Sequence, residues 1–230
     1  MKLLRKIKVL IFLSLVLLWI TSCERENIVD FGNGGAISGT VKDPNNNVVA
    51  GSITSTTLVV RALGDGDQVT TDMRVNGDGT FQNTKLYPKQ YKIWIAGPVS
   101  MTTDTLLIDF SKEKVVTKDL IVTPFITVSQ PAVVGSPTAT TVDIGYDITG
   151  NDGKVVSKRE LYCSTNPFPD ASTGSGPFYH SIKTSLGANT GNISVTGLTA
   201  NTKYYIRIGA QATGASGFNY SEQIVITTTQ

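Results

Sequence analysis

Short segments rich in Val, Ile, Thr and Tyr recur along the chain from residue 36 onward, and Gly, Asn, Asp and Pro separate them. No window after Cys23 keeps the i, i+3, i+4, i+7 apolar spacing of an amphipathic helix. Between Val142 and Ile148, apolar side chains alternate with small or acidic ones, which places one strand face in a core and the other in water. This pattern predicts an all-β chain built as β-sandwiches.

The length of 230 residues allows two domains, and Pro124 marks a boundary because it interrupts a run of strand-forming residues. We therefore expect two β-sandwich domains in tandem, over residues 36–123 and 124–230. The strands expected in the first are residues 36–41, 58–63, 72–75, 80–83, 90–96, 105–110 and 115–122. Those expected in the second are residues 141–148, 158–164, 179–183, 192–196, 203–212 and 223–229.

Residues 1–22 have the features of a secretion signal, with a basic stretch before an apolar run from Val9 to Ile20. These twelve residues are too few to span a bilayer, which takes about 20. Thr21, Ser22 and Cys23 then resemble a bacterial lipobox, which implies cleavage before Cys23 and acylation of that residue. Several acyl chains on one residue anchor a protein stably. The alternative is a secreted protein in which Cys23 is incidental.

Residues 23–35 are polar and Gly-rich, and we expect them to form a flexible tether. Glu24 and Glu26 follow the cysteine with Arg25 between them. Acidic residues at this place resemble the signal that displays Bacteroidetes lipoproteins on the cell surface. The resemblance implies an outer-membrane protein, lipid-anchored and facing the cell exterior, with a periplasm-facing placement as the alternative.

Charge and composition exclude several function classes. Residues 1–22 hold four of the 20 Lys and Arg residues, so the mature chain has 16 basic against 18 acidic residues, a formal net charge of −2. Nucleic-acid recognition needs a basic surface and is not expected. His180 is the single histidine, and there is no G-x-S-x-G motif, so we predict no hydrolase triad, metal or cofactor.

We therefore expect a protein that is not an enzyme. Paired carboxylates stay open, because glycoside hydrolysis needs only a cleft with two acids about 5 to 9 Å apart. The hydrolase hypothesis would be abandoned if no acidic pair lines a pocket. Cys163, the thiol that remains after lipidation, lies in a strand pattern that predicts a buried, unreactive residue.

Three motifs in the first half resemble known sandwich domains. Ile37 to Asp43 reads I-x-G-x-V-x-D, Gly79 to Asn83 follows an aspartate as D-G-x-F, and Leu86 to Trp94 carries a Leu-then-Tyr hairpin. They resemble the seven-stranded carboxypeptidase-regulatory-like, or prealbumin-like, domains, although Gln90 stands where those usually have Gly. The segment Asn76 to Gly79 predicts a tight hairpin; it lacks the ligand ladder of a calcium loop, as does Asp65 to Asp67.

In the second half, Leu198 to Tyr204 is similar to a fibronectin type III corner, L-x-x-x-T-x-Y. The resemblance implies that Tyr204 turns inward and that its hydroxyl bonds to the preceding backbone. Ile206 and Ile208 would continue the inward face, with Tyr205 and Arg207 pointing outward.

Together these features resemble a Bacteroidetes lipoprotein family of uncharacterised function, linked to starch-utilisation-type transport loci. The family implies two protein partners, a TonB-dependent transporter barrel and its lid lipoprotein.

Aromatic and amide side chains are the candidate ligand-binding residues. Trp94 shares a strand face with Lys92, opposite Tyr91 and Ile93, and is either a platform for a sugar ring or packed under a neighbouring loop. Loops 149–155 and 213–220 would meet at one end of the second sandwich, and segment 166–177 would lie at the opposite end. These segments and the residues that follow contribute Asn151, Asp152, Phe218, Asn219 and Tyr220 at the first end and Phe168, Phe178 and Tyr179 at the second. Gly, Ser and Asn are also ordinary loop residues.

The resulting hypothesis is a non-enzymatic surface lipoprotein that binds polysaccharide or peptide as an accessory of an outer-membrane uptake system. The alternative is a structural accessory subunit of the transporter, without a ligand of its own.

The lipobox gives a direct prediction. Mass spectrometry of the purified mature protein should find Cys23 at the amino terminus, carrying fatty acyl chains. An unmodified amino terminus would contradict the lipid anchor.

Overall fold

The computed structural model describes residues 34–53, 57–101, 105–172 and 180–230. Within these ranges the chain consists of strands, turns and loops. The described residues therefore contain no helix that could cross a membrane. Residues Gly34–Gln230 make one compact unit. The predictions for the leader, for Cys23 and for Phe178 and Tyr179 lie outside the described residues.

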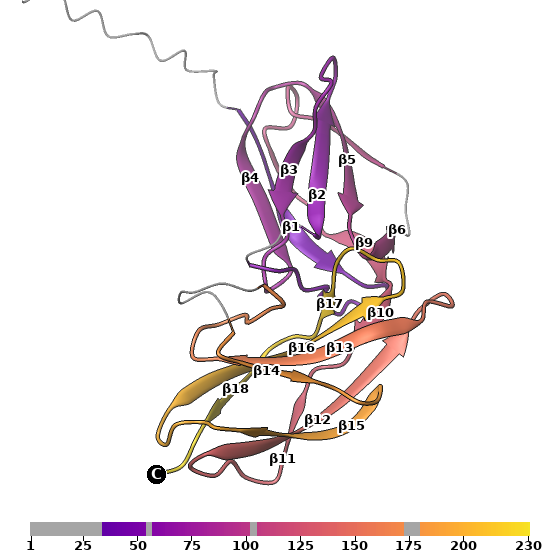
Figure 1. The fold of residues 1–230 in the computed structure, drawn as a ribbon. Coiled ribbons are helices and arrows are strands. Elements are labelled where there is room, and N and C mark those ends of the chain that lie inside the picture. Colours follow the sequence, from indigo (N-terminus) through magenta and orange to yellow (C-terminus); the bar gives the residue numbers. More distant parts are fainter. Residues whose placement is uncertain (1–33, 54–56, 102–104, 173–179) are drawn as a thin grey trace, which may run out of the picture. The chain divides into compact units, whose positions relative to one another are not determined.

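The first sandwich consists of two sheets over one core (Figure 1). One sheet has the order β4 (Thr80–Leu86), β1 (Gly35–Lys42), β9 (Leu120–Pro124) and β6 (Val99–Met101), with β8 (Val115–Thr117) also paired to β1. The other has the order β3 (Thr71–Arg74), β2 (Val59–Gly64), β5 (Gln90–Ala96) and β7 (Leu106–Asp109). Their inward side chains, such as Ile37, Phe81, Val60 and Ile93, form the core.

The second sandwich has the same two-layer construction (Figure 1). One sheet has the order β10 (Ile126–Val128), β12 (Thr141–Gly150) and β11 (Ala132–Val134), with β15 (Thr190–Thr196) on β12. The other has the order β14 (Ile182–Ser185), β13 (Val156–Ser164), β16 (Lys203–Ala212) and β17 (Asn219–Tyr220), with β18 (Ile224–Thr227) on β16. Ile144, Leu161 and Ile208 lie at the centre of its core.

The prediction of an all-β protein with tandem β-sandwiches is confirmed. The expected strand 115–122 is divided, however, into β8 and β9, which both run parallel to β1. The carbonyl of Lys118 comes so close to Gly39 that a Cβ there would lie 1.9 Å away, and the backbone amide of Thr40 donates to the Asp119 carboxylate. The Asp119 side chain thus replaces a backbone partner and interrupts the ladder.

The hairpin predicted at Asn76 to Gly79 is a tight turn, but it does not join paired strands. Gly79 has a φ of 77°, and the amide of Asn76 donates to the carbonyl of Thr80 at 2.8 Å. The strands on either side belong to different sheets, since β3 pairs with β2 and β4 pairs with β1. The turn therefore carries the chain across the core from one layer to the other.

The second half of β13 and the middle of β16 are buried on both faces, which corrects the expectation that Arg207 points into water. Ile206 and Ile208 face the second core as predicted, yet Arg207 between them has 0% of its surface exposed. Likewise, Leu161 and Cys163 face the core while Tyr162 between them is also fully buried. Burial raises the pKa of the Cys163 thiol to about 12, so this residue is the buried, unreactive cysteine that was predicted.

The tyrosine corner predicted at Tyr204 is confirmed. Its ring is buried, and its hydroxyl oxygen accepts a hydrogen bond from the backbone amide of Thr199 at 3.0 Å. The bond ties the loop before β16 to the strand itself.

Replacing Tyr204 by Phe should lower the free energy of unfolding by about 1 kcal/mol, because the Thr199 amide loses its partner while the ring stays in place. Urea unfolding measures the change. Tyr205→Phe, on the less buried face of the same strand, is the matched control and should change stability by less. Equal effects of the two substitutions would contradict the corner.

Candidate functional site

A third apolar cluster lies on the outer face of β13, β16 and β17. Ala50, from the segment after β1, packs there with Tyr162 and Tyr220, and Val48 and Phe218 contact the same cluster. A backbone bridge joins Ala50 to Tyr220. This cluster, which we call the junction cluster, therefore combines residues from both halves of the chain.

Arg207 is the charged centre of this region. Its Nε donates to the carbonyl of Ser221 at 3.0 Å, and its Nη2 donates to the carbonyl of Gly51 at 3.1 Å. Its Cζ lies 4.6 Å from the Tyr220 ring centroid. Burial lowers the pKa of Arg207 to about 10, although the electrostatic influence of Tyr220 and Asp170 raises it in part. The guanidinium is therefore charged at neutral pH.

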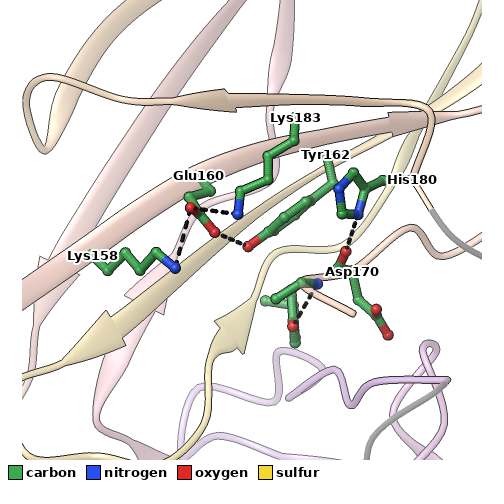
Figure 2. A network of polar contacts seen from close by, with 8 residues as sticks. Lys158, Glu160, Tyr162, Asp170, His180 and Lys183 are labelled. Atoms are coloured by element: carbon green, nitrogen blue, oxygen red, sulfur yellow. Dashed lines mark hydrogen bonds and ion pairs between the residues drawn. The ribbon is translucent and has the colours of Figure 1, made fainter. Parts of the chain in front are cut away.

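Asp170 supplies a nearby negative charge. Its Oδ2 accepts a hydrogen bond from the Ser52 hydroxyl at 2.5 Å, and its backbone carbonyl contacts Nδ1 of His180 at 2.9 Å (Figure 2). Both Asp170 and Ser52 are buried. A second polar link therefore joins the segment after β1 to the segment after β13.

Two amides predicted to bind ligand hold the backbone around Pro124. Asn219 accepts from the Ile126 amide and donates to the Pro98 carbonyl, both at 3.0 Å. Asn151 donates to the Pro124 carbonyl at 2.7 Å and to the Thr127 hydroxyl at 2.8 Å. Any contact that they make with a ligand stays a prediction.

Loops 149–155 and 213–220 meet as expected, since the amide of Thr213 donates to the carbonyl of Val155. Phe218 is half-buried and stacks on Tyr220, and Asp152 is an exposed turn residue with a φ of 49°.

Segment 166–177 begins at the predicted end, where the Phe168 amide donates to Gln223, but the described part does not stay there. The amide of Ala171 donates to the Tyr220 hydroxyl at 3.1 Å, and the Phe168 ring occupies the space over Gly77. The segment folds back over the junction cluster, where Ala171 adds to the apolar contacts and its amide pairs with the Tyr220 hydroxyl.

A groove of about 320 Å³ lies beside the junction cluster. Three separate segments line it: the Asn-rich turn after β1, the chain from β9 through β10, and the end of β17. The lining residues are Asp43, Asn47, Val48, Val49, Pro124, Ile126, Thr127, Val128, Ser129, Gln130, Asn219, Tyr220 and Glu222. Of the predicted ligand residues, Asn219 and Tyr220 are among them.

The groove combines an aliphatic floor with polar groups at its edge. Gln130, Glu222 and Asn47 are exposed, whereas Ile126 and Val49 are buried. Asp43 is the second acid here, and its two oxygens accept three hydrogen bonds from Asn45 and Asn47. An acidic pair thus lines a pocket, which keeps the hydrolase hypothesis open, although one of its members closes its own turn.

Trp94 lies on the outward face of β5, as predicted, and is half-buried. Cross-strand pairing places Arg61 opposite Trp94, and Asp72 opposite Arg61. Arg61 Nε and Asp72 Oδ1 are 3.4 Å apart, and both side chains are about two-fifths exposed. An aromatic ring, a guanidinium and a carboxylate therefore share one row of an open sheet face.

Sequence reasoning missed Arg207, Glu222 and Gln130. The alternation in 203–212 gave no signal for Arg207, because its set of positions also holds Lys203 and Gln211, which is typical of a strand face in water. Nothing in the sequence places Gln130 beside Glu222. Among the described residues, no group of three or more His, Cys, Asp or Glu side chains could hold a metal ion.

No protein-family model matches the chain, and no curated protein matches it. Solved structures do. A DUF3823 family protein from Bacteroides ovatus has a TM-score of 0.65 at 15% identity, covering 84% of this chain and 98% of its own. This similarity shows the fold.

Two further structures agree. A DUF3823 family protein from Parabacteroides merdae has a TM-score of 0.64 at 19% identity, covering 84% of this chain and 98% of its own. A Bacteroides uniformis protein named "putative carbohydrate binding protein" has a TM-score of 0.64 at 15% identity, covering 85% of this chain and 100% of its own.

Replacing Arg207 by Ala should lower the free energy of unfolding by about 3 kcal/mol, because two hydrogen bonds from a charged donor are lost at about 1.5 kcal/mol each. Urea unfolding measures this. Lys203→Ala, at an exposed position of the same strand, is the control. A difference between the two variants of less than about 0.5 kcal/mol would show that Arg207 does not stabilise the junction.

Proposed function

We propose that this protein binds carbohydrate, without catalysing a reaction, in the groove bordered by Gln130 and Glu222. The groove itself carries the proposal: a hollow of about 320 Å³ whose wall comes from three segments and whose edge is polar. Its volume lies at the lower end of the range for small-molecule sites. The fold shared with a protein named for carbohydrate binding supports the same ligand class.

The chemistry of the groove suits a sugar. The amides of Asn47 and Gln130 can donate and accept hydrogen bonds, and the Glu222 carboxylate accepts them from hydroxyl groups. The aliphatic floor, with Val128 and Ile126, can contact the C–H face of a sugar ring. A peptide would use the same amides, but the fold neighbour favours carbohydrate.

The Trp94 row is the second candidate surface for the same ligand class. An indole ring offers a large apolar face, and Arg61 and Asp72 beside it offer a donor and an acceptor. The groove is preferred because it surrounds a ligand on several sides, whereas the sheet face contacts it from one side.

The proposed cellular location of the binding site rests on the amino-terminal signal sequence. We propose that acylated Cys23 tethers the protein to the outer membrane, facing outward, where it serves a TonB-dependent transporter and its lid lipoprotein. The lipobox and the residues after it support this location. If the tagged protein is purified and no large barrel protein accompanies it, this would count against the transporter complex. It would also count against the alternative of a purely structural subunit.

The double variant Gln130→Ala with Glu222→Ala should weaken retention on polysaccharide affinity gels at least about tenfold, because it removes two hydrogen-bonding groups from the groove. The gels contain amylopectin, galactan, xylan or dextran. Gln82→Ala with Glu113→Ala changes the same residue types at exposed positions elsewhere and is the matched control.

Three outcomes would overturn parts of this proposal. Absence of retention by every polysaccharide would contradict carbohydrate binding. Retention lost in Trp94→Ala but kept in the groove variant would move the site to the sheet face. Shortened glycan chains after incubation, lost in Glu222→Ala, would contradict a non-enzymatic role and revive the hydrolase hypothesis.

A further inference from the structure

A buried carboxylate on β13 is held by two lysines at the protein surface. The Glu160 side chain is 3% exposed, and its Oε1 lies 3.3 Å from Nζ of Lys158 and 3.0 Å from Nζ of Lys183. Its other oxygen, Oε2, accepts a hydrogen bond from the Tyr162 hydroxyl at 2.5 Å. Figure 2 shows the two ammonium groups directed at one oxygen and the phenol at the other.

The charges in this cluster do not balance. Burial raises the pKa of Glu160, but the hydrogen bonds from Tyr162, Lys183 and Lys158 outweigh it and hold the pKa below its usual value. Glu160 is therefore ionised at neutral pH and supplies one negative charge against two positive ones. Because both ammonium groups lie within 3.3 Å of the same oxygen, their mutual repulsion is neutralised only in part.

The ammonium groups keep donors available for a further partner. Each carries three N–H groups, and the side chains of Lys158 and Lys183 are 49% and 35% exposed. The fixed carboxylate beneath them orders two otherwise flexible side chains, which reduces the entropy lost on binding an anion.

An aromatic ring adjoins this pair. Nζ of Lys158 lies 5.3 Å from the centroid of the half-buried Phe218 ring. The surface therefore presents two cations beside an apolar face, a combination that matches a sugar ring bearing a carboxylate. None of these three residues lines the groove.

We infer that Lys158, Lys183 and Phe218 form a second binding site, which takes the carboxylate of an acidic sugar such as a uronic acid. The inference rests on the proposed carbohydrate binding and adds a substrate class to it. The two ammonium groups donate to the carboxylate oxygens, and the sugar ring lies beside the part of the Phe218 ring that Tyr220 and Lys158 leave uncovered.

Isothermal titration calorimetry with oligogalacturonate tests the inference on the full mature chain, with galactan oligosaccharide as the neutral comparison. Oligogalacturonate should bind more tightly, and its affinity should fall as salt is raised from about 0.05 M to about 0.5 M, because surface charge interactions are screened. Lys158→Gln with Lys183→Gln should weaken oligogalacturonate binding at least about tenfold.

Two further variants keep the result interpretable. Adding Glu160→Gln to the double lysine variant removes the carboxylate that would otherwise be left buried without cations, so a folded protein without the site is obtained. Lys112→Gln removes a lysine whose side chain is 84% exposed, at a position distant in sequence, and should leave binding unchanged. Thermal unfolding confirms that each variant is folded.

Equal affinity of the folded triple variant and the wild type for oligogalacturonate would overturn the site, as would equal affinity of the wild type for galactan and oligogalacturonate. Equal or tighter binding of dextran sulfate would overturn the carboxylate assignment. The groove variant Gln130→Ala with Glu222→Ala separates the two proposals. The groove variant should lose retention on neutral polysaccharide gels, whereas the lysine variants should keep that retention.

Discussion

The burial of one guanidinium organises the contact between the two halves of this chain. A guanidinium without water must find fixed hydrogen-bond acceptors within the protein, and Arg207 donates to the carbonyls of Ser221 and Gly51, one from each half. The Tyr220 ring contacts the same group. Around it, Ala50 and Tyr162 exclude water, and the Ser52–Asp170 bond adds a second polar link. A separated second sandwich would expose this cluster together with an unpaired charge, so we expect the two sandwiches to be stable only in contact.

This contact also forms the groove. The Asn-rich turn after β1 is held near β10 and the end of β17 by the pairing of Ala50 with Tyr220, while Asn219 holds the backbone of Pro98 and Ile126. The proposed sugar site is therefore not a property of either sandwich alone. The lysine site differs, since Lys158, Glu160, Lys183 and Phe218 all belong to the second sandwich. One mature chain would thus present a site that depends on the junction and a site that is independent of it.

Sequence reasoning succeeded where the controlling interactions are local. The spacing from Leu198 to Tyr204 is enough to predict the corner, because the hydroxyl of Tyr204 reaches the backbone of Thr199 within the same loop. Alternation along β5 likewise separates Tyr91 and Ile93 from Trp94. Alternation distinguishes two faces but does not say what covers the second one, so Arg207 was expected in water. Short strands such as β17, with two residues, have no periodicity to read. Gln130 and Glu222 come together through the tertiary arrangement of segments about ninety residues apart in the sequence.

The turn at Gly77 shows how closely the halves constrain each other. A Cβ at this position would lie 2.4 Å from the Phe168 ring, so even a methyl group there would push the aromatic side chain away. An evolutionary change in a turn of the first sandwich is thereby restricted by a residue that belongs to the second. A sandwich taken from another protein could replace either one only if it preserved its own side of this contact.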